Sequence, residues 1–415
     1  MTAAPQSREA AAVLPAAVLP AARTWADVDL GRVAGNARAL QNLEPGAGLM
    51  AIVKADAYGH GAVPVARACA TSRAGVAHFG VACLTEANEL RGAGVRAELY
   101  TLSPFLPDEA EALVRADVTP FVSSVEQLFA LADAGGRAPL PARCFLKVDT
   151  GMGRGGCLPD EAHELWSLAH ILSDGLRVTG IATHFSDADE PDRDPTERQV
   201  QAFDAFLRYP PRASCVPDDG RGNTGLWLSS ANSPGALRFA DPDAASVPFP
   251  VRGVLVRAGL ALYGIEPFAG AFADHPEIRP ALSWRARVVL VRDLPTGATI
   301  GYGRTCTLTR PSRIATLAAG YADGLSRRLS NVGHVLLHGQ RVPLVGRVSM
   351  DQCQADVTDV PGVQTGDVAT IIGRDGAERQ SVLDLARLLD TTPHEPTCAL
   401  SRRVVRHYHN SGGDE

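Results

Sequence analysis

Short apolar runs alternate with amphipathic stretches over roughly the first two thirds of the chain. Glycine, proline, aspartate or serine flanks these runs, as is typical of buried strands. The runs lie at 49–55, 78–82, 97–103, 118–124, 143–150, 176–185, 226–232 and 254–257. Helix-like stretches such as 126–134 and 196–208 lie between them. Eight strand–helix units in about 240 residues predict a TIM (β/α)8 barrel over 24–266, with a doubly wound open sheet as the alternative.

The pattern changes after a join rich in proline and glycine at 267–280. Beyond the join, 282–292, 335–347 and 365–373 are strand-like with polar turns, and only 381–390 is helix-like. The sequence therefore predicts a second, mostly β domain over 275–415.

Residues 1–23 are rich in alanine and proline and show no clear period. They predict a disordered tail. A signal peptide is the rival interpretation. No cluster of positive charge precedes the apolar residues, however, and two prolines interrupt the apolar run, which argues against secretion.

Composition narrows the class of protein further. The formal net charge of −6 disfavours nucleic-acid binding, and no apolar run has the ~20 residues of a membrane helix. The eight cysteines are scattered and form no Cys-x-x-Cys pair, which indicates reduced thiols in a cytoplasmic protein and no metal site.

Lysine is rare in this chain. Of 40 basic residues only two, Lys54 and Lys147, are lysines. A lysine amine forms a Schiff base or a carbamate, which an arginine guanidinium does not. Lys54 ends the first run and is well placed to bind an aldehyde cofactor, although a surface lysine is the usual alternative. Lys147 shares a strand face with Asp149, and either an ion pair with Asp149 or a carbamate fits there.

Other polar residues follow later barrel strands, where the chemistry of this fold is located. Arg154 lies on a glycine-rich turn after the fifth strand, and His184 ends the sixth. The loops after strands seven and eight are the usual phosphate site of the fold. They contain Asn232, Ser233, Arg257, Gly259 and Leu260, and the hydroxyl of Tyr58 is a further candidate. Ordinary turn chemistry is the alternative for several of them.

The second domain has three glycine-rich segments with isolated polar residues. They are IGYGRT with Tyr302, AAGYADG with Tyr321, and GRVSMDQ with Met350 and Asp351. Each residue taken singly is more typical of a turn than of a catalytic group.

Together these motifs resemble the alanine racemase family of pyridoxal 5'-phosphate (PLP) enzymes. VKADAYGHG is highly specific for that family. LKVDTGMGR, THF, ANS, RAGLALYG, YGRT, GYADG and GRVSMDQ then occur in the family's order. The resemblance covers residues 24 to about 408. It implies a barrel, a β domain, a small amino-acid substrate and a homodimer whose active sites are shared across the interface.

The resemblance also implies the roles of the catalytic residues. Lys54 would carry PLP as an internal aldimine and act as one base, and Tyr302 would act as the opposite base in the partner's barrel. Arg154 would hold the cofactor's phenolate side and the substrate carboxylate. Met350, Tyr321 and Asp351 would line the entrance and the substrate side.

The remaining implied roles concern the cofactor. Arg257 would face the pyridine nitrogen, and His184 would hydrogen-bond Arg257 or Tyr302. Lys147 matches a position that is often carbamylated. The phosphate would be held by Tyr58, Ser233, Gly259 and Leu260, next to Asn232.

Three positions depart from the family pattern. Arg402 stands where some members have a phosphate-contacting tyrosine, Val405 replaces a proline, and Ser229 replaces a histidine. These changes affect the expected phosphate contacts and substrate range.

The rival functions are a serine or broad-specificity racemase, a barrel-fold decarboxylase, and a non-catalytic PLP-binding protein. A decarboxylase should have a carboxylate in place of Arg257, and a PLP-binding protein should lack the second domain.

Overall fold

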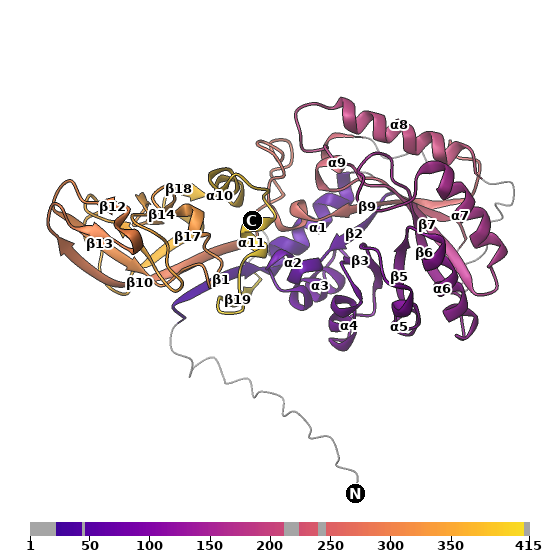
Figure 1. Ribbon diagram of the computed structural model, residues 1–415, viewed down its shortest axis with the longest axis horizontal. Helices are drawn as coiled ribbons and strands as arrows, with labels where there is room; N and C mark the ends of the chain where they lie inside the picture. The colour runs from indigo at the N-terminus through magenta and orange to yellow at the C-terminus, as the bar shows by residue number, and fades with distance from the viewer. Residues whose placement is uncertain (1–21, 44–45, 211–223, 240–245, 411–415) are drawn as a thin grey trace, which may run out of the picture.

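The computed structural model describes residues 22–43, 46–210, 224–239 and 246–410. The chain forms a barrel followed by a β domain, and the two lie side by side (Figure 1). Most of the predicted tail, residues 1–21, lies outside the described residues.

The barrel closes as the apolar runs predict. Eight parallel strands of the described chain pair in sequence order, and β9 pairs back with β2. They are β2 (Gly48–Ile52), β3 (His78–Val81), β4 (Glu98–Thr101), β5 (Val118–Val122), β6 (Ala142–Lys147), β7 (Leu176–Ala182), β8 (Leu226–Ser229) and β9 (Val251–Ala258). Large side chains fill the interior: the Phe121 and Phe145 rings stack with centroids 5.1 Å apart. A methyl group at Gly180 would lie 2.3 Å from the Phe145 ring, so glycine is needed there.

Helices follow the strands and cover the outside of the barrel (Figure 1). They are α1 (Leu30–Leu43), α2 (Lys54–Tyr58), α3 (Ala62–Thr71), α4 (Leu84–Gly92), η1 (Pro107–Glu109), α5 (Ala110–Arg115), α6 (Val125–Gly136), α7 (Pro159–Ile171), α8 (Asp194–Arg208), α9 (Ser233–Arg238) and η2 (Leu260–Tyr263). Side-chain capping sets the start of two of the described barrel helices, α6 and α9. The Ser124 hydroxyl, for example, accepts the Gln127 N–H at the start of α6.

The second domain is a β domain, as the change of pattern after 267–280 predicts. Its strands are β10 (Leu282–Leu294), β11 (Thr299–Ile300), β12 (Cys306–Thr307), β13 (Ser312–Leu317), β14 (His334–Leu337), β15 (Gln340–Pro343), β16 (Cys353–Asp356), β17 (Val368–Asp375), β18 (Glu378–Gln380) and β19 (Val405–His409). Short helices connect them: η3 (Tyr302–Arg304), η4 (Arg327–Leu329), α10 (Val382–Leu389) and α11 (Glu395–Cys398). β10 is central, because it pairs with β1, β13 and β17.

The boundary predicted at residue 24 is wrong for the first strand. β1 (Thr24–Asp29) does not enter the barrel; it pairs antiparallel with β10 and parallel with β19 in the sheet of the second domain. Its side chains alternate between buried and half-buried over Thr24–Asp27. That alternation suits a sheet with one face covered better than a barrel strand covered on both faces.

Candidate active site

The peptide that follows β2 has an unusual backbone. Four consecutive residues, Ala55 to Tyr58, have φ between 52° and 54°, which is a left-handed turn that L-residues rarely adopt. Side chains hold the turn, because Glu86 accepts the Ala55 N–H at 2.9 Å and Asp56 accepts the Ala62 N–H at 2.8 Å. The strain is concentrated directly after Lys54, as is common at functional sites.

Lys54 is half-buried, and burial lowers the pKa of its amine, with Arg154 lowering it further. Lys147 ends β6, and its pKa lies well below the usual range because of burial, with Arg257 and Arg154 adding to the effect. The two lysines therefore lie in one electropositive site, and both amines lose their proton more easily than an exposed lysine.

An ion pair with Lys147 would need the Asp149 carboxylate as its partner, whereas a carbamate on Lys147 would not. The Asp149 carboxylate accepts the backbone N–H groups of Gly151, Met152 and Gly153 at 2.8–2.9 Å. The charge of Asp149 raises the pKa of Lys147, but the hydrogen bonds that its carboxylate accepts in the described residues come from this turn. Asp149 thus shapes the glycine-rich turn that carries Arg154.

The side chain of Arg257, on β9, is buried and has several hydrogen-bond partners. It is 4% exposed, and its guanidinium donates to the Thr183 carbonyl at 2.7 Å, the Ser230 carbonyl at 3.1 Å and the Ser229 hydroxyl. It also lies 2.9 Å from Nδ1 of His184. Ser229, at the end of β8, supplies the hydroxyl that accepts from Arg257.

His184 is a neutral acceptor in this arrangement. Burial lowers the pKa of its imidazole well below the usual range, and Arg257 and Lys147 lower it further. A guanidinium has only donors, so Nδ1 of His184 must accept. Of the two partners expected for His184, Arg257 is the one it contacts within this chain.

A small cradle lies beside Lys54 at the end of the turn. The Ser233 hydroxyl accepts the Gly259 N–H at 2.9 Å, and a methyl group at Gly259 would lie 2.5 Å from the Tyr58 hydroxyl oxygen. Leu260 is buried next to them. Asn232 caps α9 by accepting the Gly235 N–H at 3.0 Å, and so fixes the start of the helix on which Ser233 lies.

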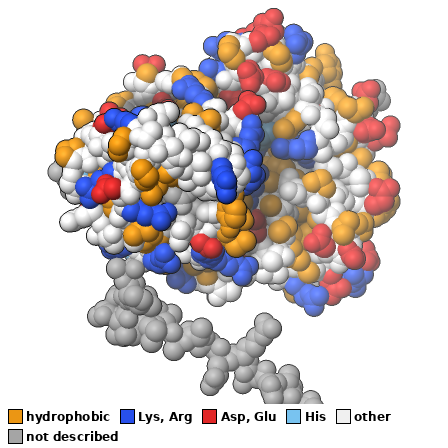
Figure 2. Space-filling model, turned by 60° about the vertical axis from the view of Figure 1, so that its left-hand side comes forward, with side chains coloured by type: hydrophobic (Ala, Val, Ile, Leu, Met, Phe, Trp, Pro, Cys, Tyr) orange, Lys and Arg blue, Asp and Glu red, His pale blue; other side chains and the backbone are white. Residues whose placement is uncertain are grey.

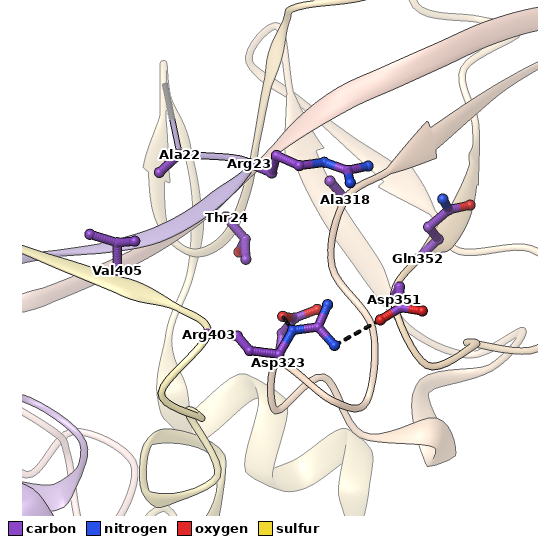
Figure 3. Close-up of a pocket in the computed structure, with 9 residues that line it drawn as sticks. All are labelled: Ala22, Arg23, Thr24, Ala318, Asp323, Asp351, Gln352, Arg403 and Val405. Atoms are coloured by element: carbon purple, nitrogen blue, oxygen red, sulfur yellow. Dashed lines mark hydrogen bonds and ion pairs between the residues drawn. The ribbon is translucent and has the colours of Figure 1, made fainter. Parts of the chain in front are cut away.

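The second-domain candidates do not join this site within one chain. Tyr302, Tyr321 and Met350 are 72%, 45% and 52% exposed. Tyr302 lies between β11 and β12, and β12 lies at the end of the β domain remote from the barrel (Figure 1). Asp351 is paired with Arg403 (Figure 3).

Sequence reasoning missed two groups near Lys54. The ring of His394 packs edge-on against Tyr58 with centroids 5.3 Å apart, and burial, together with Lys54, lowers the pKa of His394 to about 4. Burial raises the pKa of the Cys398 thiol, in α11, and the nearby charge of Lys54 offsets part of that rise. The segment TPHEPTC, which contains both residues, has no motif that indicates a site. Only the packing of α11 on α2 in the structure shows that they lie near Lys54.

The surface is consistent with an anionic ligand. Figure 2 shows basic side chains beside the hollow between the β domain and the barrel. With two lysines in the chain, they are almost all arginines, which suit carboxylates and phosphates. In the described ranges, no group of three or more His, Cys, Asp or Glu is placed to hold a metal ion, and no helix is long and apolar enough to cross a bilayer.

The fold and the site define an enzyme of the barrel class with a lysine-centred active site and an added β domain. Residues 28–267 match the family described as "Alanine racemase, N-terminal domain", and residues 281–408 match "Alanine racemase, C-terminal domain". The chain therefore belongs to the alanine racemase family, and its activity is that of an alanine racemase. The resemblance noted in the motifs is confirmed.

Individual relatives agree over nearly the whole chain. An alanine racemase of Symbiobacterium thermophilum is 40% identical over 387 residues, covering 93% of this chain and 97% of the relative. The crystal structure of alanine racemase from Streptomyces lavendulae has a TM-score of 0.83 at 33% identity, covering 95% and 98%. Alanine racemase from Bartonella henselae, solved with covalently bound pyridoxal phosphate, has a TM-score of 0.79 at 28% identity, covering 94% and 100%.

Proposed function

We propose that the chain interconverts L-alanine and D-alanine with PLP held at the carboxyl end of the barrel. The observation that carries this proposal is the cradle of Tyr58, Ser233 and Gly259 beside Lys54, where the absence of a side chain at Gly259 lets the Tyr58 hydroxyl approach the backbone next to the Ser233 hydroxyl. A primary amine with a lowered pKa next to a small polar cradle fits an aldehyde that carries a phosphate. The bound PLP of the Bartonella henselae enzyme supports the same assignment.

When bound, PLP accepts the electron pair left on the α-carbon after proton loss. Lys54 is proposed as the base on one face of that carbon. Because burial and Arg154 lower its pKa, the amine is free to take a proton at a lower pH than an exposed lysine. Arg154 is exposed on its turn and is proposed to hold the substrate carboxylate.

Arg257 is proposed to face the pyridine nitrogen of the cofactor. A guanidinium keeps its own protons, so it leaves that nitrogen largely unprotonated. Its partners at Ser229, Thr183 and His184 fix the orientation of the guanidinium. We also propose that Lys147 is carbamylated, since burial lowers the pKa of its amine well below the usual range and its positive neighbours Arg257 and Arg154 favour an anion.

Inversion needs a second base on the opposite face, and we propose Tyr302 of a partner subunit for that role. The exposure of Tyr302, Tyr321 and Met350 on one chain supports a homodimer in which they complete the partner's site. The described cysteines are free, which supports a cytoplasmic setting.

Incubation of the purified protein with PLP and L-alanine in D2O tests the proposed reaction. We expect deuterium at Cα together with accumulation of D-alanine, measured by NMR and chiral chromatography, because a proton is removed on one face and solvent deuterium is returned on the other. Exchange at Cα without D-alanine would contradict the proposal of two bases on opposite faces.

A further inference from the structure

The segment 395–406 of the β domain packs directly on the Lys54 turn of its own barrel. A methyl group at Gly59 would lie 2.1 Å from the Thr397 carbonyl oxygen, so the two backbones touch. Arg406 donates from Nε to the Gly59 carbonyl at 3.1 Å. The segment is therefore anchored to the turn that positions Lys54 and Tyr58.

The same segment is also tied to two loops of the β domain. Arg403 places Nε 3.1 Å from an oxygen of Asp323 and donates from Nη1 to Asp351 at 2.7 Å (Figure 3). The Ser401 N–H donates to the Asp323 carbonyl at 3.2 Å. A methyl group at Gly324 would lie 2.5 Å from the Ala399 carbonyl oxygen. Arg403 thus bridges a carboxylate on each loop.

These two loops carry Tyr321 and Met350, and their backbones are interlocked. The Tyr321 N–H donates to the Ser349 carbonyl and the Ala322 N–H to the Met350 carbonyl, both at 3.0 Å. A methyl group at Gly320 would lie 2.3 Å from the Met350 carbonyl oxygen. The loops therefore move together, and a group that fixes one also fixes the other.

The charges make Arg403 necessary to this arrangement. The Asp323 side chain is only 2% exposed, and burial raises the pKa of its carboxyl, while Arg403 lowers it and Asp351 raises it. Without Arg403 the Asp323 carboxylate would lose its ion-pair partner, keep only the Gly320 N–H and the more distant charge of Arg23, and face a second carboxylate. Repulsion between Asp323 and Asp351 would then separate the two loops.

We infer that Arg403 is a positioning residue that sets the place of Tyr321 and Met350 in the partner subunit's active site, and that segment 395–406 links that site to the Lys54 turn of its own barrel. The inference rests on the proposed function, in which the loops of one subunit complete the site of the other. Arg403 acts through Asp323 and Asp351 and touches no reacting atom. Asp351 accordingly serves to hold Met350 in place.

The test uses heterodimers of differently tagged chains in which Lys54→Ala inactivates one barrel. In the first, a wild-type chain is paired with a Lys54→Ala/Arg403→Met chain, so the working barrel meets loops that lack Arg403. We expect the KM for L-alanine to rise roughly tenfold with a smaller change in kcat, since a misplacement of about 1 Å has effects of this order or larger. The reference is the wild-type/Lys54→Ala heterodimer.

In the second heterodimer, an Arg403→Met chain is paired with a Lys54→Ala chain. The working barrel now meets loops that retain Arg403, so KM should equal that of the reference. A rise in KM in the second heterodimer alone, or in both heterodimers, would overturn the inference. An unchanged KM in both heterodimers would overturn it as well. Hydrogen exchange at the Tyr321 and Ala322 amides should also be faster in the Arg403→Met chain.

Two further variants keep the test interpretable. Asp351→Asn removes the charge from the exposed arm of the bridge but keeps a hydrogen-bond acceptor, so it should give a smaller rise in the same heterodimer, even if Arg403→Met folds poorly. Arg387→Met, an exposed arginine in the last turn of α10, is the matched control and should leave KM unchanged. A heterodimer of Lys54→Ala with Tyr302→Phe that shows no activity would instead reject the shared site itself.

Discussion

Lys54→Ala is expected to lower racemisation of both alanine enantiomers by about 10⁴-fold or more, because the proposed roles of cofactor anchor and of base both fall on this one amine. The substitution should leave the fold intact, since the left-handed turn begins at Ala55 and its hydrogen bonds come from Glu86 and Asp56. Chiral chromatography measures the loss of racemisation. The visible absorbance of protein-bound PLP measures the loss of cofactor attachment.

The chain offers a direct check on this assignment. Only Lys54 and Lys147 provide lysine amines, so borohydride reduction followed by peptide mass analysis has two possible side-chain targets. Label on the Lys54 peptide is expected. Label on the Lys147 peptide, or racemisation that persists in Lys54→Ala, would show that the anchor is misassigned.

Tyr302→Phe is expected to slow α-proton removal from one alanine enantiomer by roughly 10²- to 10⁴-fold, the range of a lost general base. Removal from the other enantiomer should fall much less, because Lys54 remains on its face. Single-turnover experiments with each α-deuterated enantiomer separate the two rates. The side chain is 72% exposed, so loss of its hydroxyl should not disturb folding.

Tyr209→Phe is the matched control for this variant. Tyr209 is 75% exposed and lies just after α8, in the barrel rather than in the β domain. It should behave like the wild type for both enantiomers. Equal losses for both enantiomers in Tyr302→Phe would reject the assignment of one base to each face.

The fold was largely predictable because buried strands leave a local signal. Each of the eight apolar runs became a barrel strand, and 381–390 became α10. β1 was misplaced because a short alternating strand carries no information about which sheet it joins. Its partners, β10 and β19, lie more than 250 residues away in the sequence.

The site was predictable only where a residue follows a strand. Lys54, His184 and Arg257 meet because barrel strands end at one face, which the order of motifs implies. The role of Asp149, which accepts three backbone N–H groups, could be seen only in the folded turn. The position of His394 depends on α11 docking across the domain boundary, which no local pattern indicates.

The shared active site is the central claim, and a purified heterodimer of Lys54→Ala with Tyr302→Phe tests it most directly. Each parent homodimer should have little or no activity. The heterodimer combines Lys54 of one chain with Tyr302 of the other in one complete site, so we expect about half of the wild-type rate per dimer. A heterodimer as inactive as its parents would contradict the account, because Lys54 and Tyr302 would then have to come from the same chain.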